Sequence, residues 1–185
     1  MATEHESKKG NKKKAGKKDQ MHATVGGTVA VSRELLIAGL QEDLSREYQA
    51  ILAYVVYSQA LKGAAYMAIA RELEVHASEE LAHALTIAKQ IDYLGAMPNA
   101  TAIPVKLTED PEKMLRADLD NENQTIRAYR ERVRQCEALG EFAIGEEIRE
   151  ILRQEQEHQV DLATALGEDV PDVSKMKATK EKKEK

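Results

Sequence analysis

The sequence predicts an all-α fold, a four-helix bundle in which one long crossover joins the second helix to the third. The first observation is composition: Ala, Leu, Ile and Glu, which favour helices, are abundant, and aromatic residues make up only 4% of the 185 residues. The second is that four segments repeat apolar residues every three or four positions. The third is that two very short connections and one long connection join these segments, an arrangement typical of bundles.

The first two helices are marked by a capping residue and by glycines. The first helix is expected at residues 32–62, because Ser32 is a suitable N-cap and Gly63 lies just past its end. The second helix is expected at residues 64–94 and stops before Gly95. The stretch that follows, of about 15 residues, contains two prolines and no helical period, so it is a connection.

The last two helices follow the same signals. The third is expected at residues 110–139, where Asp110 is a suitable cap and Pro111 suits the first helical position. The fourth is expected at residues 141–166, directly after Gly140. Only one or two residues join the first helix to the second and the third helix to the fourth. Each of these two pairs is therefore an antiparallel hairpin. Because about 15 extended residues can traverse the ~45 Å length of such a helix, the predicted topology is up-down-down-up.

Charge is distributed unevenly along the chain. Residues 1–31 hold seven Lys against three acidic residues, and we expect a flexible basic arm there. Residues 32–167, the predicted bundle, carry a net charge of −10. Residues 168–185 hold six Lys against five acidic residues and contain Pro171, so we expect a short, solvated, charged tail.

The location of the protein is predicted from features that the sequence lacks. No apolar run approaches the roughly 18 residues of a membrane span, and the N-terminal residues have no apolar core of a secretion signal. The single cysteine, Cys136, cannot form a disulfide within the chain and fits a reducing compartment. We therefore expect a cytoplasmic protein with no membrane partner.

The two halves of the predicted bundle resemble each other. SREYQAILAY at 45–54 aligns with DNENQTIRAY at 120–129. Each half places a Glu seven residues before a Tyr and 33 residues before a Glu-x-x-His pair. Matched spacing in both halves makes the pattern far more specific than one Glu-x-x-His alone. The repeated residues are Glu47, Tyr54, Glu80 and His83 in the first half, and Glu122, Tyr129, Glu155 and His158 in the second.

The repeated glutamates and histidines lie on or beside the apolar stripe that each helix buries, and we find no Lys or Arg at the stripe positions. Stranding an ionised carboxylate in such a core costs several kcal/mol, against a total stability of about 5–15 kcal/mol. Two divalent cations would balance four carboxylates, and each imidazole supplies a neutral nitrogen ligand. Oxygen-rich sites with one histidine per metal suit Fe(II) or Mn(II). The alternative, protonated carboxyl groups hydrogen-bonded to one another and to the tyrosines, leaves the matched spacing unexplained.

Residues 32–166 resemble the ferritin-like diiron carboxylate proteins, and bacterioferritins in particular. The likeness rests on five segments: REYQAILAY, EELAH, YLGAMPN, MLRADLDNE and ILRQEQEH. A Glu from each of two helices and a Glu-x-x-His from each of the other two is the ligand set of this class. The resemblance thus implies a ferritin-like bundle that binds two iron ions per subunit.

The resemblance also implies a role for each repeated residue. Glu47 and Glu122 would be terminal ligands, and Glu80 and Glu155 would bridge the two metals. His83 and His158 would each bind one iron. Tyr54 matches a tyrosine near the site in bacterioferritins, and Tyr129 repeats it in the second half, as in rubrerythrin-like relatives. Each tyrosine would hydrogen-bond the ligands, supply an electron, or serve only to pack the helices together.

Two positions depart from the bacterioferritin pattern. The haem-ligating Met of bacterioferritins is replaced by Leu81, so we expect no haem. A fifth helix after the bundle is doubtful in residues 168–185, which are polar and interrupted by Pro171. A 12-subunit shell like that of Dps-like proteins with a bacterioferritin-type centre is then at least as well supported as a 24-subunit shell.

The leading functional hypothesis is a ferroxidase that oxidises Fe(II) with O2 or H2O2 and stores ferric mineral inside a homo-oligomeric shell. The alternative is a rubrerythrin-like peroxidase or another diiron or dimanganese redox enzyme, which would need an electron-transfer partner. An additional role is non-specific DNA binding through the Lys-rich residues 8–18, as in Dps arms. A solubilising tail, or binding to another polyanion or to a protein, would account for the arm equally well.

Overall fold

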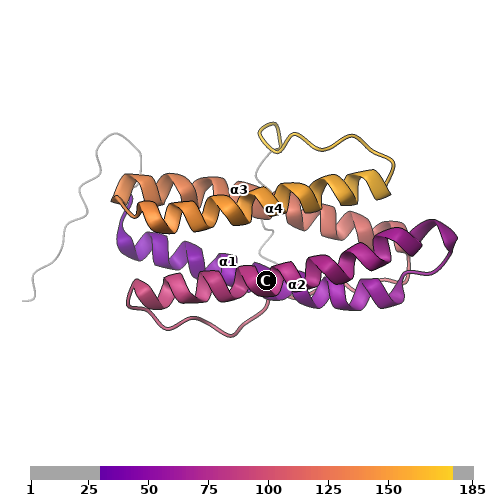
Figure 1. Cartoon of the computed structure of the whole chain (residues 1–185), viewed down its shortest axis with the longest axis horizontal. Coiled ribbons are helices and arrows are strands. Elements are labelled where there is room, and N and C mark those ends of the chain that lie inside the picture. The colour runs from indigo at the N-terminus through magenta and orange to yellow at the C-terminus, as the bar shows by residue number, and fades with distance from the viewer. Residues whose placement is uncertain (1–29, 177–185) are drawn as a thin grey trace, which may run out of the picture. The chain divides into compact units, whose positions relative to one another are not determined.

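The computed structural model describes residues 30–176, and most of the predicted arm and the last nine residues lie outside this range. Four helices run side by side in a bundle. Figure 1 shows α1 and α4 pointing in one direction and α2 and α3 in the other, so the predicted up-down-down-up topology is confirmed. The helices are α1 (Arg33–Ala60), α2 (Met67–Tyr93), α3 (Pro111–Leu139) and α4 (Phe142–Ala165), with a short 3-10 helix η1 (Ala64–Tyr66) before α2.

The helix ends follow from local chemistry. The Ser32 hydroxyl accepts a hydrogen bond from the Leu35 amide at the start of α1, and the Asp110 carboxylate accepts from two amides at the start of α3. Gly140 ends α3 in the left-handed conformation, with φ of 75°. The second helix differs from its predicted start at residue 64. No side chain caps that end, and the chain makes a 3-10 turn before the α-helix begins at Met67.

The crossover between α2 and α3 lies along α1. The Asn99 side chain donates to the Gln41 carbonyl at 2.7 Å, and the Gln41 side-chain oxygen accepts from the Asn99 amide at 2.8 Å. Farther along, the Tyr57 hydroxyl donates to the Lys106 carbonyl. These bonds to both halves of α1 hold the crossover against the bundle.

Two apolar clusters fill the bundle on either side of a polar middle. One contains Leu40, Ile87 and Ile148, and the other contains Leu73 and Leu119. In every helix the repeated glutamates and histidines lie in sequence between residues of the two clusters. The polar layer is therefore sealed by aliphatic side chains on both sides.

A buried ion pair was not predicted from the sequence. The Arg132 side chain is buried, with its Nε 2.6 Å from Asp43 Oδ2 and its Nη1 2.6 Å from Gln135 Oε1. Gly39 faces this guanidinium, since a Cβ atom at that position would lie 2.0 Å from Arg132 Nη1. The pair joins α1 to α3. The buried arginine is therefore neutralised by an aspartate and not by a repeated glutamate.

The first part of the C-terminal tail is mostly exposed, but a few of its residues contact the bundle. The Val173 side chain is only 5% exposed, and the Gln159 side chain of α4 donates to the Pro171 carbonyl at 3.1 Å. Arg116 Nη1 pairs with Glu168 Oε2 at 2.6 Å. No helix forms in 168–176, the part of the tail that the structure describes. Among the helices of residues 30–176, none has the length and apolar character that a membrane span requires.

Candidate metal centre

The structure brings all six repeated glutamates and histidines together in the polar middle of the bundle. They form two groups, and within each group the potential ligand atoms all lie within 4.8 Å of one another. Glu80 and Glu155 belong to both groups, so the two potential metal positions share two carboxylates. No member is more than 2% exposed. The groups are Glu47, Glu80, His83 and Glu155, and Glu80, Glu122, Glu155 and His158.

Helix geometry and the internal repeat create this arrangement. Residues at i and i+3 lie on the same face of a helix, so each Glu-x-x-His pair points its Glu and its His into the same layer. The tyrosines cross between the halves: Tyr54 donates to Glu122 Oε1 and Tyr129 donates to Glu47 Oε1. Each tyrosine thus holds the unshared glutamate of the other half.

The buried oxygen atoms of the cluster fit a pair of cations. His83 Nδ1 lies 3.1 Å from Glu80 Oε2, 3.2 Å from Glu155 Oε1 and 3.4 Å from Glu47 Oε2, yet a ring nitrogen carries at most one hydrogen. Both oxygens of Glu155 lack a hydrogen-bond partner, as does one oxygen of each of the other three glutamates. Leaving such an acceptor buried and unpaired costs about 1–3 kcal/mol. Two divalent cations would satisfy these oxygens, and the set of carboxylates with one imidazole per position suits Fe(II) or Mn(II).

Without metal, protons balance the charge of the cluster. Burial, followed by the charges of neighbouring glutamates, raises the pKa of Glu47 and of Glu122 well above the usual range. Burial disfavours a charged His158, but the nearby Glu155 and Glu80 carboxylates raise its pKa to about 12. The pKa of His83 is raised for the same reasons. In metal-free protein these shifts favour protons on both imidazoles and on both unshared glutamates.

Binding of two divalent cations is expected to release about four protons near neutral pH, because ligation requires deprotonated carboxylates and imidazole nitrogens. Calorimetric titration with Co(II) in buffers of different ionisation enthalpy measures this number. Since the four groups have raised pKa values, protons compete with the metal more strongly at low pH. The apparent affinity should therefore increase as the pH rises. Binding without proton release would contradict these protonation states.

The outer nitrogens of both histidines have partners that the sequence interpretation missed. His158 Nε2 lies 2.9 Å from Glu79 Oε2, and His83 Nε2 lies 2.9 Å from Gln154 Oε1. A signal was present in the sequence, because residues 79 and 154 are separated by the same 75 positions that relate the two halves. Such outer partners orient metal-binding histidines and tune their basicity.

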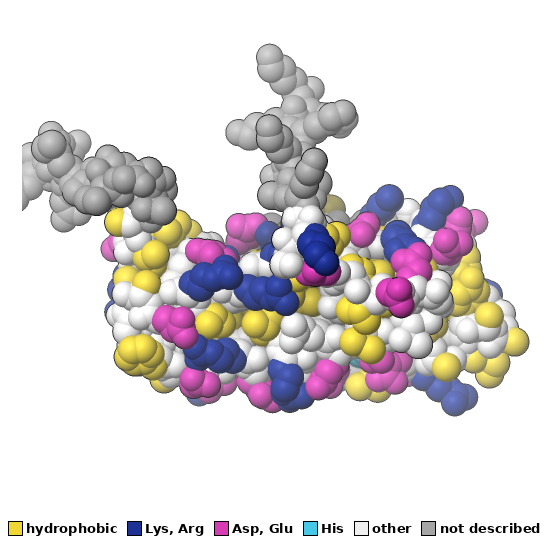
Figure 2. Space-filling model, turned by 90° about the horizontal axis from the view of Figure 1, so that it is seen from above, with side chains coloured by type: hydrophobic (Ala, Val, Ile, Leu, Met, Phe, Trp, Pro, Cys, Tyr) yellow, Lys and Arg dark blue, Asp and Glu magenta, His cyan; other side chains and the backbone are white. Residues whose placement is uncertain are grey.

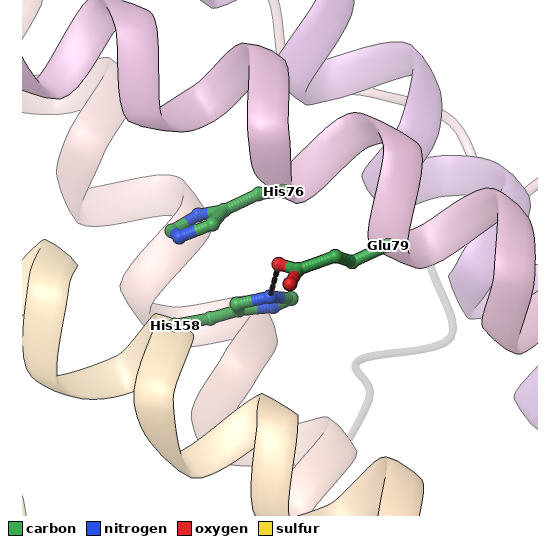
Figure 3. A group of neighbouring side chains, drawn as sticks. All are labelled: His76, Glu79 and His158. Carbon is green, nitrogen blue, oxygen red and sulfur yellow. Dashed lines mark hydrogen bonds and ion pairs between the residues drawn. The ribbon is translucent and has the colours of Figure 1, made fainter.

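His76 covers the ring of His158. The two rings are stacked, with centroids 4.0 Å apart (Figure 3). His76 Nε2 lies 3.4 Å from Asp161 Oδ2 and 3.9 Å from Glu72 Oε1. Burial and the charge of His158 lower the pKa of His76 to about 4, so this ring is neutral at physiological pH. The stacking shields His158 from solvent on the side where Glu72 and Asp161 are exposed.

A cavity of about 240 Å³ reaches the carboxylates from between α1 and α3. All four repeated glutamates line it, and the more exposed Glu42, Arg46 and Asn121 line it as well. His83 and His158 are absent from its lining. The cavity therefore gives ions and small oxidants a route to the glutamates that is lined by polar side chains.

Comparisons with known proteins agree with this fold and site. Bacterioferritin of Brucella melitensis biotype 1 is 26% identical over 141 residues, and the match covers 72% of this chain and 88% of that protein. Bacterioferritin of Rhodobacter capsulatus is 29% identical over 129 residues, covering 69% of this chain and 77% of that protein.

A crystal structure of ferritin-like, diiron-carboxylate proteins from Bacillus anthracis strain Ames superposes with a TM-score of 0.70 at 30% sequence identity. The match covers 72% of this chain and 96% of that chain. The ferritin-like domain, as a family, matches residues 37–169. This span contains all four helices apart from the first turn of α1, and every repeated Glu, His and Tyr. The chain belongs to the family of ferritin-like domain proteins.

Proposed function

We propose that this protein is a ferroxidase that oxidises Fe(II) at a dinuclear site within one subunit and stores the ferric product in an oligomeric shell. The observation that supports this best is the pair of buried ligand groups that share Glu80 and Glu155. Shared carboxylates hold two metal ions close together, so two electrons are available to one oxidant. Bacterioferritin relatives point in the same direction.

Each repeated residue has a defined part in the proposed reaction. Glu47 and Glu122 bind one Fe(II) each, Glu80 and Glu155 bridge both, and His83 and His158 complete the two positions. Fe(II) is the substrate, and each ion gives up one electron. Two Fe(II) and two protons convert O2 to H2O2, or H2O2 to two water molecules. The Tyr54 and Tyr129 hydroxyls hold the unshared glutamates in place during this change of charge.

The outer surface of α1 and α2 supports an oligomer. Six aliphatic side chains on these helices are 42–66% exposed, and Val55 and Leu81 also line a shallow groove between α1 and α2. Exposed apolar groups of this kind mark protein interfaces. On the face over α3 and α4, basic, acidic and apolar side chains are interspersed (Figure 2). The six exposed residues are Leu52, Val55, Val56, Val75, Leu81 and Leu85.

Three further expectations stay predictions. Leu81 offers no sulfur ligand at the position of the bacterioferritin methionine, so we expect no haem. The metal is iron in the leading proposal, and manganese is the alternative. Non-specific DNA binding through residues 8–18 concerns a segment outside the described residues.

The proposal is tested by mixing metal-free, assembled protein with Fe(II) and O2 or H2O2. We expect rapid oxidation of two Fe(II) per subunit, followed by retention of much more iron in a soluble particle of 12 or 24 subunits. Absorbance follows oxidation, and native mass measurement gives the particle size and its iron content. A dimer that consumes peroxide but retains no iron beyond two ions per subunit would instead identify a rubrerythrin-like redox enzyme.

A further inference from the structure

The two histidine rings have the same orientation relative to the carboxylate cluster. In each ring Nδ1 faces the glutamates, and Nε2 faces a residue outside the cluster. Glu79 contacts the His158 ring, and Figure 3 shows this bond between α2 and α4. Gln154 contacts the His83 ring. Each outer residue therefore comes from the opposite half of the repeat to the histidine that it contacts.

The outer contacts form one continuous hydrogen-bonded chain. Gln154 Nε2 donates to Glu79 Oε1 at 3.4 Å, and its amide oxygen accepts from His83 Nε2. An ionised carboxylate only accepts hydrogen bonds, so Glu79 fixes the direction of the chain. Both histidines then carry a hydrogen on Nε2, which leaves Nδ1 of each ring to bind a metal.

The repeat is broken at these two positions. Residue 79 is Glu and residue 154, its equivalent 75 positions later, is Gln. Because their polar atoms are 3.4 Å apart, two ionised carboxylates there would repel each other strongly. A carboxylate paired with an amide avoids that repulsion. The consequence is that one histidine donates to an anion and the other to a neutral group.

We propose that Glu79 makes the two metal positions unequal, so that the position served by His158 binds a divalent cation more tightly than the position served by His83. A carboxylate that accepts from Nε2 makes the imidazole a more basic ligand, whereas an amide oxygen does so less. Glu79 is a positioning residue, since it touches the ligand and not the metal. This inference rests on the proposed dinuclear site.

The expected size of the difference follows from metal sites in general. Loss of an outer-shell partner typically changes metal affinity by about 10–100-fold. The Glu79 side chain is 33% exposed, so water screens part of its charge. We therefore expect a difference of about tenfold between the two positions, the lower end of that range.

The test uses Co(II) as a probe that O2 does not oxidise readily, on the assembled full-length protein. Crystals are soaked with less than one Co(II) per subunit, and anomalous scattering gives the occupancy of each position. Calorimetry in solution gives the two affinities. The critical variant exchanges the outer residues, Glu79→Gln with Gln154→Glu, and keeps one carboxylate and one amide. The single variant Glu79→Gln places an amide beside both histidines.

Wild-type protein should fill the His158 position first, the exchange variant should fill the His83 position first, and Glu79→Gln should remove most of the preference. A purely structural role for Glu79 would not reverse the order. Equal filling in wild-type protein, or an unchanged order in the exchange variant, would overturn the inequality while leaving the dinuclear site intact. If wild-type protein binds no Co(II) between Glu80 and Glu155, the proposed site and this inference both fail.

Discussion

Replacing Glu80 by alanine is expected to lower the initial rate of Fe(II) oxidation by more than about 100-fold, the upper end of what loss of an outer-shell partner costs. Glu80 is a member of both ligand groups, so its loss removes one ligand from each metal position. It also removes a carboxylate that lies 3.0 Å from His158 Nδ1. Stopped-flow absorbance after mixing with Fe(II) and O2 measures the rate.

A matched control lies on the same helix. Asp92 is exposed near the end of α2, so Asp92→Ala removes a carboxylate from the same element without touching the cluster or the groove between α1 and α2. Both variants should keep their helical circular dichroism and native particle mass, because neither change opens a large apolar cavity. If correctly assembled Glu80→Ala protein oxidised Fe(II) at the wild-type rate, Glu80 would have no role in the proposed reaction.

Breaking the buried pair between α1 and α3 should have the largest effect on stability. Arg132→Met leaves Asp43 buried without its partner, although burial already raises the pKa of Asp43. Removing one partner of a buried ion pair costs about 3–5 kcal/mol, a large part of the roughly 5–15 kcal/mol that stabilises a typical domain. Urea denaturation of metal-free protein, at one fixed protein concentration, measures the change.

Two comparisons isolate the cause of that loss. Arg134, also on α3, pairs with Glu131 at the surface and its side chain is 69% exposed, so Arg134→Met should change the free energy of unfolding by only about 0–1 kcal/mol. Replacing both buried partners, with Asp43→Leu and Arg132→Met together, should recover much of the loss, because apolar replacements of buried ion pairs are often neutral or stabilising. If Arg132→Met alone matched the surface control, Asp43 would not depend on the guanidinium.

Most residues of the site were predicted from the internal repeat. Helical periodicity is local, so the sequence places Glu80 and His83 on one face of a helix without knowledge of the neighbouring helices. Equal spacing in the second half then predicts a second set at the same depth. This explains how six ligand candidates and four helices were predicted from the chain alone. The start of the second helix was not, because no side chain caps that end.

Contacts between helices were beyond this kind of prediction. A tyrosine seven residues after a glutamate was visible in each half, but its bond to the glutamate of the other half depends on how α1 and α3 face each other. The same holds for the outer partners of the histidines and for the buried Arg132, whose helix position alone did not indicate a partner on α1. The sequence likewise did not indicate that Val173 is buried within a tail whose neighbouring residues are exposed.

By itself, the sequence determined the four helices, their order of direction and the identity of the eight repeated polar residues, because each depends on periodicity, capping and loop length within a short stretch of chain. Only the tertiary structure decided that a polar cavity between α1 and α3 reaches the glutamates, and that one histidine faces a carboxylate and the other an amide. Those features arise where residues far apart in the sequence meet, and the relative rotation and separation of packed helices set such distances.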